Sequence, residues 1–156
     1  MKASIKEISE SEYKKSDVLV LFEDELTDRV FGLISNGVNE YKFGWQSTLI
    51  KPIIKFINDN YCSIGIDLIF VIFDFNTGRI LQKLSLDYYF YDIKLFNGFL
   101  YVITQLEIIK INIADLTIVE IYPLPDYFES IEFNEKVIVV KCIGDEVVEF
   151  PEKVDR

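Results

Sequence analysis

The sequence predicts an all-β protein built from repeated antiparallel sheets, and three observations support this prediction. Short runs rich in Ile, Val, Phe and Tyr recur along the chain, such as YCSIGI (61–66) and FLYVIT (99–104). Turn-forming pairs such as Asn97-Gly98 separate these runs. Similar segments return every 38–39 residues. Apolar, β-branched and aromatic runs of this length, bounded by Asn and Gly, are typical of strands.

The repeat is visible when the sequence is compared with itself. Residues 86–104 align with residues 124–142 without a gap, at a shift of 38. At a shift of 39, IKFIN (54–58) aligns with IKLFN (93–97), and the third copy contains IEFN (131–134). Because two further strand-like runs follow each copy, we expect the copies to share one strand order.

The elements follow from composition and turn signals. Asn97-Gly98 predicts a two-residue hairpin, since a type I′ turn needs positive φ at both positions. Ser9 to Lys15 is expected to form one or two helical turns, and residues 45–57 stay ambiguous. Strands are expected at 54–57, 61–66, 68–75, 80–85, 92–96, 99–104, 107–113, 118–122, 130–133, 137–142 and 146–150.

Repeated apolar positions are the candidate core. We expect burial of Ile93, Leu95, Val102, Ile131, Phe133 and Val140. The aromatic pairs Tyr89/Tyr127 and Phe90/Phe128 also recur at the shift of 38, which predicts that they pack between strands.

The chain of 156 residues is expected to be a single domain. We divide it into an N-terminal arm (1–17), a divergent unit (about 18–53) and the repeats (about 54–150).

A family resemblance rests on the segment Phe73-Asp74-Phe75-Asn76-Thr77-Gly78-Arg79-Ile80. This segment resembles the turn between strands of quinoprotein-type and related β-propeller repeats, and Asn97-Gly98 followed by an apolar run is similar to the next inner strand. The WD dipeptide of many propellers is absent. The resemblance implies an open, partial propeller, because residues 54–150 hold three blades and residues 18–44 at most a fourth.

The charge of the chain and the residue types that it lacks exclude several classes of function. The net charge is −10, made up of −4 in residues 1–28, zero in 29–119 and −6 in 120–156. Such a surface repels phosphate, which argues against a nucleic-acid partner. There is no histidine, which removes Ser-His-Asp and Cys-His catalysis and His-ligated metal. We expect no enzyme activity, no catalytic residues, no cofactor and no metal.

The expected location of the protein follows from sequence features that it lacks, and the thiol state follows from its cysteines. The N-terminus lacks the apolar core of a secretory signal, and the longest apolar run, 68–73, is too short to span a membrane. We therefore expect a cytoplasmic protein without membrane contact. Cys62 and Cys142 are expected to be reduced and buried.

The candidate binding residues are acids and tyrosines that do not recur in the repeat. Tyrosine beside a carboxylate suits contact with Arg and Lys, through ring area, cation–π attraction and charge pairing. The first set is Asp87, Tyr88, Tyr91, Asp126 and Glu129, and a second patch is Glu23, Asp24 and Glu25. An ordinary solvated surface is the plainer interpretation of the same residues.

In size, acidity and lack of catalytic motifs the chain is similar to immunity proteins of toxin–immunity systems, including contact-dependent growth inhibition. This resemblance implies a basic protein partner, a toxin nuclease, whose active cleft the acidic residues would cover. Two alternatives remain open at this point. One is a propeller-like module completed by self-association. The other is a sugar- or lactone-processing enzyme that uses metal or a carboxylate pair drawn from Asp67, Asp74, Asp87, Asp92 and Asp126.

Overall fold

A computed structural model describes residues 2–24 and 29–152 of the chain. The chain separates into two compact units, Met1–Ser85 and Leu86–Arg156, which are described one at a time. The strands of the described residues form four sheets, and each strand pairs only within its own sheet. The prediction of an all-β fold with repeated sheets is confirmed.

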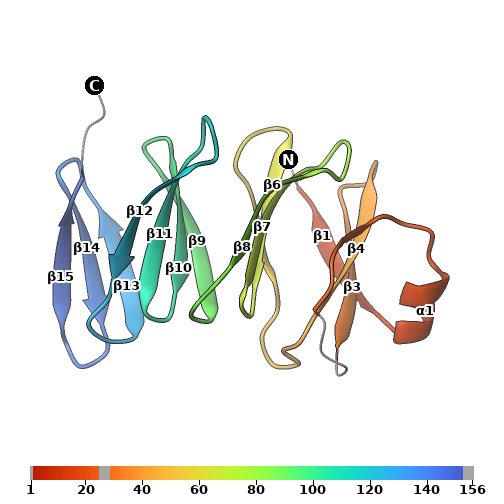
Figure 1. The fold of residues 1–156 in the computed structure, drawn as a ribbon, viewed down its shortest axis with the longest axis horizontal. Coiled ribbons are helices and arrows are strands. Elements are labelled where there is room, and N and C mark those ends of the chain that lie inside the picture. Colours follow the sequence, from red (N-terminus) through yellow and green to blue (C-terminus); the bar gives the residue numbers. More distant parts are fainter. Residues whose placement is uncertain (1, 25–28, 153–156) are drawn as a thin grey trace. The chain divides into compact units, whose positions relative to one another are not determined.

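The first unit contains two four-stranded sheets and one short helix (Figure 1). Its elements are β1 (Ser4–Ile8), α1 (Glu10–Lys15), β2 (Val20–Phe22), β3 (Val30–Ser35), β4 (Glu40–Trp45), β5 (Ile53–Phe56), β6 (Tyr61–Ile66), β7 (Ile69–Asp74) and β8 (Ile80–Ser85). Residues 1–17, expected to form an arm, thus contribute β1 and α1, and β1 pairs with β3.

The predicted helix at Ser9–Lys15 is confirmed. Its first turn is held by a capping box, in which Ser9 Oγ accepts from the N–H of Glu12 at 3.1 Å and the Glu12 carboxylate accepts from Ser9. Its last turn is closed by Lys42 of β4, whose Nζ donates to the carbonyls of Tyr13 and Ser16, both at 2.8 Å. A cation at this end also matches the helix dipole.

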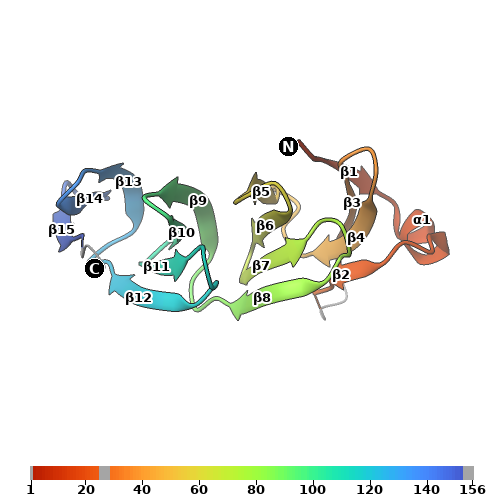
Figure 2. The ribbon, with the colours of Figure 1, turned by 90° about the horizontal axis from the view of Figure 1, so that it is seen from above.

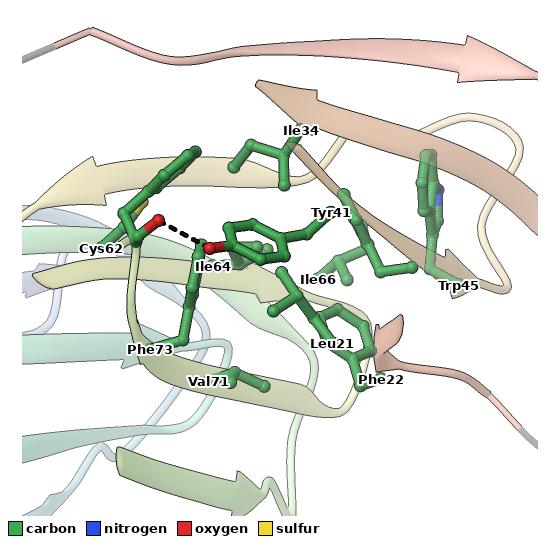
Figure 3. Packing of buried hydrophobic residues seen from close by; sticks show 12 residues of the cluster. Leu21, Phe22, Ile34, Tyr41, Trp45, Cys62, Ile64, Ile66, Val71 and Phe73 are labelled. Carbon is green, nitrogen blue, oxygen red and sulfur yellow. Dashed lines mark hydrogen bonds between the residues drawn. The ribbon is translucent and has the colours of Figure 1, made fainter. Parts of the chain in front are cut away.

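The strand order of the first sheet is β1-β3-β4-β2, and β2 runs parallel to β4, unlike the other pairs. The second sheet is a simple meander, β5-β6-β7-β8. Apolar side chains from β2, β3, β4, β6 and β7 form the shared core. Figure 3 shows Tyr41 reaching across this core toward Phe73, and its hydroxyl donates to the carbonyl of Phe75 at 2.7 Å.

The second unit contains the meander β12-β11-β10-β9 and the three-stranded sheet β13-β14-β15 (Figures 1 and 2). Its elements are β9 (Phe90–Phe96), β10 (Phe99–Thr104), β11 (Glu107–Asn112), β12 (Ile118–Pro123), β13 (Phe128–Phe133), β14 (Val137–Cys142) and β15 (Val147–Pro151). Every strand predicted from 54 to 150 is present. Asn97 and Gly98 have φ of 54° and 81°, which confirms the predicted hairpin turn.

The two sheets of this unit pack through Tyr101, Ile103 and Ile108 on one side and Ile138 and Val140 on the other. Ile93, Val102 and Val140 are buried as predicted, and Phe133 and Ile131 are partly buried against this core.

Three predicted core positions are wrong. Leu95 is exposed because it lies toward the end of β9, the edge strand of its sheet. Tyr89 and Tyr127 are exposed because the next residue of each, Phe90 or Phe128, takes the inward place. Successive side chains of an extended chain point to opposite faces, and here only the face that takes Phe90 and Phe128 is covered. Both cysteines are free and buried, as predicted.

Candidate functional site

Two β-bulges place predicted site residues on the second unit. In β9, Phe90 pairs with Thr104 and Asp92 with Ile103, which leaves Tyr91 as the extra residue. In β13 the pairing shifts in the same way between Phe128 and Ser130, which leaves Glu129 extra. These positions are equivalent in the repeat. A bulge bends the strand and re-aims the side chain, so Tyr91 and Glu129 are both exposed.

The loops next to these bulges are joined by backbone hydrogen bonds. Gln105 in the β10–β11 turn donates to the carbonyl of Tyr89 at 3.0 Å and accepts from the N–H of Phe128 at 2.8 Å. Ile143 in the β14–β15 turn donates to the carbonyl of Tyr127 at 2.8 Å. Four connecting segments therefore form one continuous row at one end of the strands (Figure 1).

This row presents large side chains to solvent. Tyr88, Tyr89, Tyr91, Tyr127 and Ile143 are 38%, 54%, 51%, 49% and 54% exposed. The Tyr91 ring also packs on Phe128, with ring centroids 5.2 Å apart, so it is held in place. Ordered, exposed aromatic groups that gather on one surface are typical of protein-binding sites.

Carboxylates border the tyrosines. We name the acidic–aromatic surface as Asp87, Tyr88, Tyr89, Tyr91, Asp126, Tyr127, Glu129, Ile143, Asp145 and Glu146. Lys141 lies among the acids, with its Nζ 3.7 Å from Glu129 and 3.9 Å from Asp145. Five carboxylates and this one lysine leave the surface strongly negative.

Carboxylates of this surface add to the effect of burial on the pKa of two nearby groups. The pKa of Cys142 is raised first by burial and then by the carboxylates of Glu146, Asp126 and Glu129. The pKa of Glu107 is likewise raised by burial and by Asp87. The structure thus brings together all five residues of the first predicted set. It adds five residues that sequence analysis missed, which are Tyr89, Tyr127, Ile143, Asp145 and Glu146.

The second predicted patch lies in the first unit and is partly neutralised. Arg29 Nη1 is 3.0 Å from a Glu23 carboxylate oxygen and also donates to the carbonyl of Asp24 at 3.0 Å. Gln46 contacts the Asp24 carboxylate at 3.4 Å. Glu25 lies outside the described residues. Glu23 and Asp24 therefore present less net charge than the acidic–aromatic surface.

Two of the five aspartates considered for catalysis, Asp67 and Asp74, hold turns and loops. Asp67 Oδ2 accepts from the N–H groups of Gln46 and Ser47, at 2.8 and 3.1 Å. Asp74 Oδ1 accepts from Asn76 at 2.9 Å. Within residues 2–24 and 29–152, no three His, Cys, Asp or Glu side chains gather as metal ligands. No helix in the described part of the chain is long and apolar enough to cross a membrane.

No family model and no curated protein matches the sequence. Solved structures match the fold. The computationally designed protein Ika4 is 10% identical with a TM-score of 0.53, over 88% of this chain and 92% of that one. The repeated sheets of this chain are propeller-like. Sqt1 from Saccharomyces cerevisiae is 11% identical (TM-score 0.53, 82% of this chain), and Hsv2 from Kluyveromyces lactis is 13% identical (TM-score 0.51, 86% of this chain).

Sqt1 and Hsv2 are β-propeller-type proteins, and this chain covers 43% and 45% of their respective lengths. At these identities the likeness concerns the fold, and the predicted propeller resemblance is confirmed at that level. The resemblance to immunity proteins has no counterpart among the structures named here.

Proposed function

We propose that this chain is a protein-interaction module that binds a basic partner through the acidic–aromatic surface. The observation that supports the proposal is the joining of equivalent loops from two repeats into one row, which gathers four exposed tyrosines and five carboxylates. Tyrosine contributes contact area at low entropic cost, and carboxylates pair with Lys and Arg on the partner. Propeller-type neighbours fit a scaffold that presents loops for binding.

The specific form of the proposal is neutralisation of a toxin nuclease. A nuclease cleft is lined with cations that bind phosphate, and a negative surface with aromatic anchors would cover it and exclude nucleic acid. In this role the chain binds and does not catalyse. The net charge of −10 would also speed the encounter with such a partner.

The test is a binding measurement with the purified product of the gene next to the one that encodes this chain. The double variant Asp87→Lys/Asp126→Lys is expected to slow association and weaken binding. Association of the unchanged protein should also slow between about 0.01 M and about 0.15 M salt, because the Debye length falls from about 30 Å to about 8 Å. Replacing Tyr89 and Tyr127 by Ser should accelerate dissociation.

The matched control is Glu132→Lys/Glu135→Lys, which makes the same change in net charge on exposed positions of β13 and its following turn. This control should retain most of the affinity. Circular dichroism and urea unfolding would show that every variant is folded. Equal loss of binding in both double variants, or an affinity that ignores salt and all these changes, would contradict binding through this surface.

A further inference from the structure

The last sheet has a free edge where comparable sheets have a fourth strand. The sheets β5–β8 and β9–β12 each have four strands, and β8 and β12 are their outer strands. Within residues 2–24 and 29–152, the third copy stops at three strands, with β15 outermost. Among these described residues, no strand takes the place that corresponds to β12.

The backbone of β15 is arranged to accept that strand. At its two ends, Glu146 and Glu152 bond to the β14 side, each at 2.8 Å. In an antiparallel pair these inward bonds fall on alternate residues. The N–H and C=O groups of Val147 and Glu149 therefore point to the free edge, as does the carbonyl of Pro151. Val147 and Glu149 are also exposed.

The neighbouring sheet shows what faces this position. Val102 and Val140 are equivalent in the repeat. Val102 pairs with Ile109 of β11 and Val140 pairs with Val148 of β15. The residues that follow, Lys110 and Glu149, are therefore equivalent too. Lys110 lies opposite Glu120 of the outer strand β12 in the backbone register, and its ammonium pairs with Glu152. The charge is inverted at Glu149. Opposite charges on directly paired residues stabilise a sheet, so a strand beside Glu149 should carry Lys or Arg there.

We propose that the edge of β15 takes up an extended segment of another protein, with a basic residue opposite Glu149 and apolar residues around it, as the fourth strand of the last sheet. A second copy of the chain fits less well. Two β15 strands paired about Glu149 would set the two carboxylates against each other, and both copies carry −10. This site lies on a strand edge and does not depend on the acidic–aromatic surface.

The test uses two synthetic peptides with the sequence of residues 115–125, DLTIVEIYPLP, one unchanged and one with Glu120→Lys. The lysine peptide should bind the full chain about tenfold more tightly than the unchanged peptide, measured by fluorescence anisotropy. Hydrogen exchange should show new protection of the Val147 and Glu149 amides on binding. In the Glu149→Lys protein the preference between the peptides should reverse.

The matched control is Glu132→Lys, on β13 of the same sheet and away from the free edge, which should leave the preference unchanged. Four results would overturn the proposal. These are no saturable binding up to about 1 mM, a preference that does not reverse, protection that appears elsewhere, and Val147 and Glu149 amides already protected without peptide. Light scattering that shows a dimer lost on Glu149 substitution would instead assign the edge to a second copy.

Discussion

Lys110 and Glu152 form a buried ion pair in the second unit. Their closest atoms are 3.5 Å apart, and both side chains are 2% exposed. The Tyr101 hydroxyl donates to the Glu152 carboxylate at 3.1 Å, and the ammonium lies 4.0 Å from the centre of the Phe99 ring. Because Glu152 directly follows β15, this pair fastens that strand to β11 of the neighbouring sheet.

Removing the negative charge from this pair should be costly. We expect Glu152→Gln to lower the free energy of unfolding by about 3 kcal/mol, since it leaves the Lys110 ammonium buried without a counter-charge. The double variant Lys110→Met/Glu152→Leu should recover much of the loss. Urea unfolding measures both. Glu129→Gln, in an exposed pair with Lys141, serves as control and should change stability by less than about 1 kcal/mol. Equal effects of Glu152→Gln and Glu129→Gln on the free energy of unfolding would show that the buried ion pair contributes no more to stability than the exposed one.

At the scale of single elements, the turn between β7 and β8 needs glycine for two reasons. Gly78 has φ of 76°, a conformation that strains other residues. A Cβ added there would also lie 2.5 Å from Leu19 Cδ2 and 2.6 Å from Tyr41 Cε1. Gly37, in the turn after β3, has φ of 91° but no atom within 4 Å of an added Cβ.

These two glycines separate backbone strain from steric overlap. Gly37→Ala should cost about 1 kcal/mol, from strain alone. Gly78→Ala should cost about 1–3 kcal/mol more, because Leu19 and Tyr41 must move. Both lie in the first unit, whose unfolding the fluorescence of buried Trp45 reports during urea titration. Equal losses for the two variants would mean that the turn relaxes without cost.

Local signals explain why most elements could be predicted. Strands between 54 and 150 are bounded by turn residues and carry matching repeats, so their limits could be predicted to within a residue or two. The bulges at Tyr91 and Glu129 could not, because each depends on pairing with a distant strand. The exposure of Tyr89 and Tyr127 was missed for the same kind of reason. Their recurrence shows equivalent positions but not which face of the sheet they occupy.

The parallel pairing of β2 with β4 also lay beyond local patterns. It brings residues 20–22 next to a strand some twenty residues later, after β3 has already paired with β4. The candidate binding residues could be selected from the sequence because charge and aromatic character can be seen there directly. Their gathering on one surface could not be predicted, because it depends on the hydrogen bonds between loops around Gln105.

Across the whole molecule, buried phenols and thiols set an alkaline limit to stability. Burial raises the pKa of Cys62 from 9.0 to about 12 and that of Tyr13 from 10.0 to about 12. Tyr101 and Tyr122 of the second unit are shifted in the same direction, by burial and by nearby carboxylates. Each group must stay protonated in the folded chain, whereas the unfolded chain can release its protons.

Because their pKa values are raised in the folded chain, these protonated groups stabilise the fold fully below about pH 9, and the stabilisation is lost as pH rises toward 12. Each group should contribute a slope of about 1.4 kcal/mol per pH unit in its window. Urea unfolding of Cys62→Ala, followed by Trp45 fluorescence between pH 7 and 10.5, should give a shallower decline above pH 9 than the unchanged protein. Parallel curves would show that this thiol does not couple to folding.

The attachment of Glu152 also determines how the last hairpin responds to tension. Within residues 2–24 and 29–152, β15 pairs on one side only, so a pull on the backbone just after Glu152 would separate it from β14 one bonded pair at a time. The load would reach Glu152 first, before any pair of the ladder. The buried contacts with Lys110 and Tyr101 therefore set the force at which the hairpin begins to open.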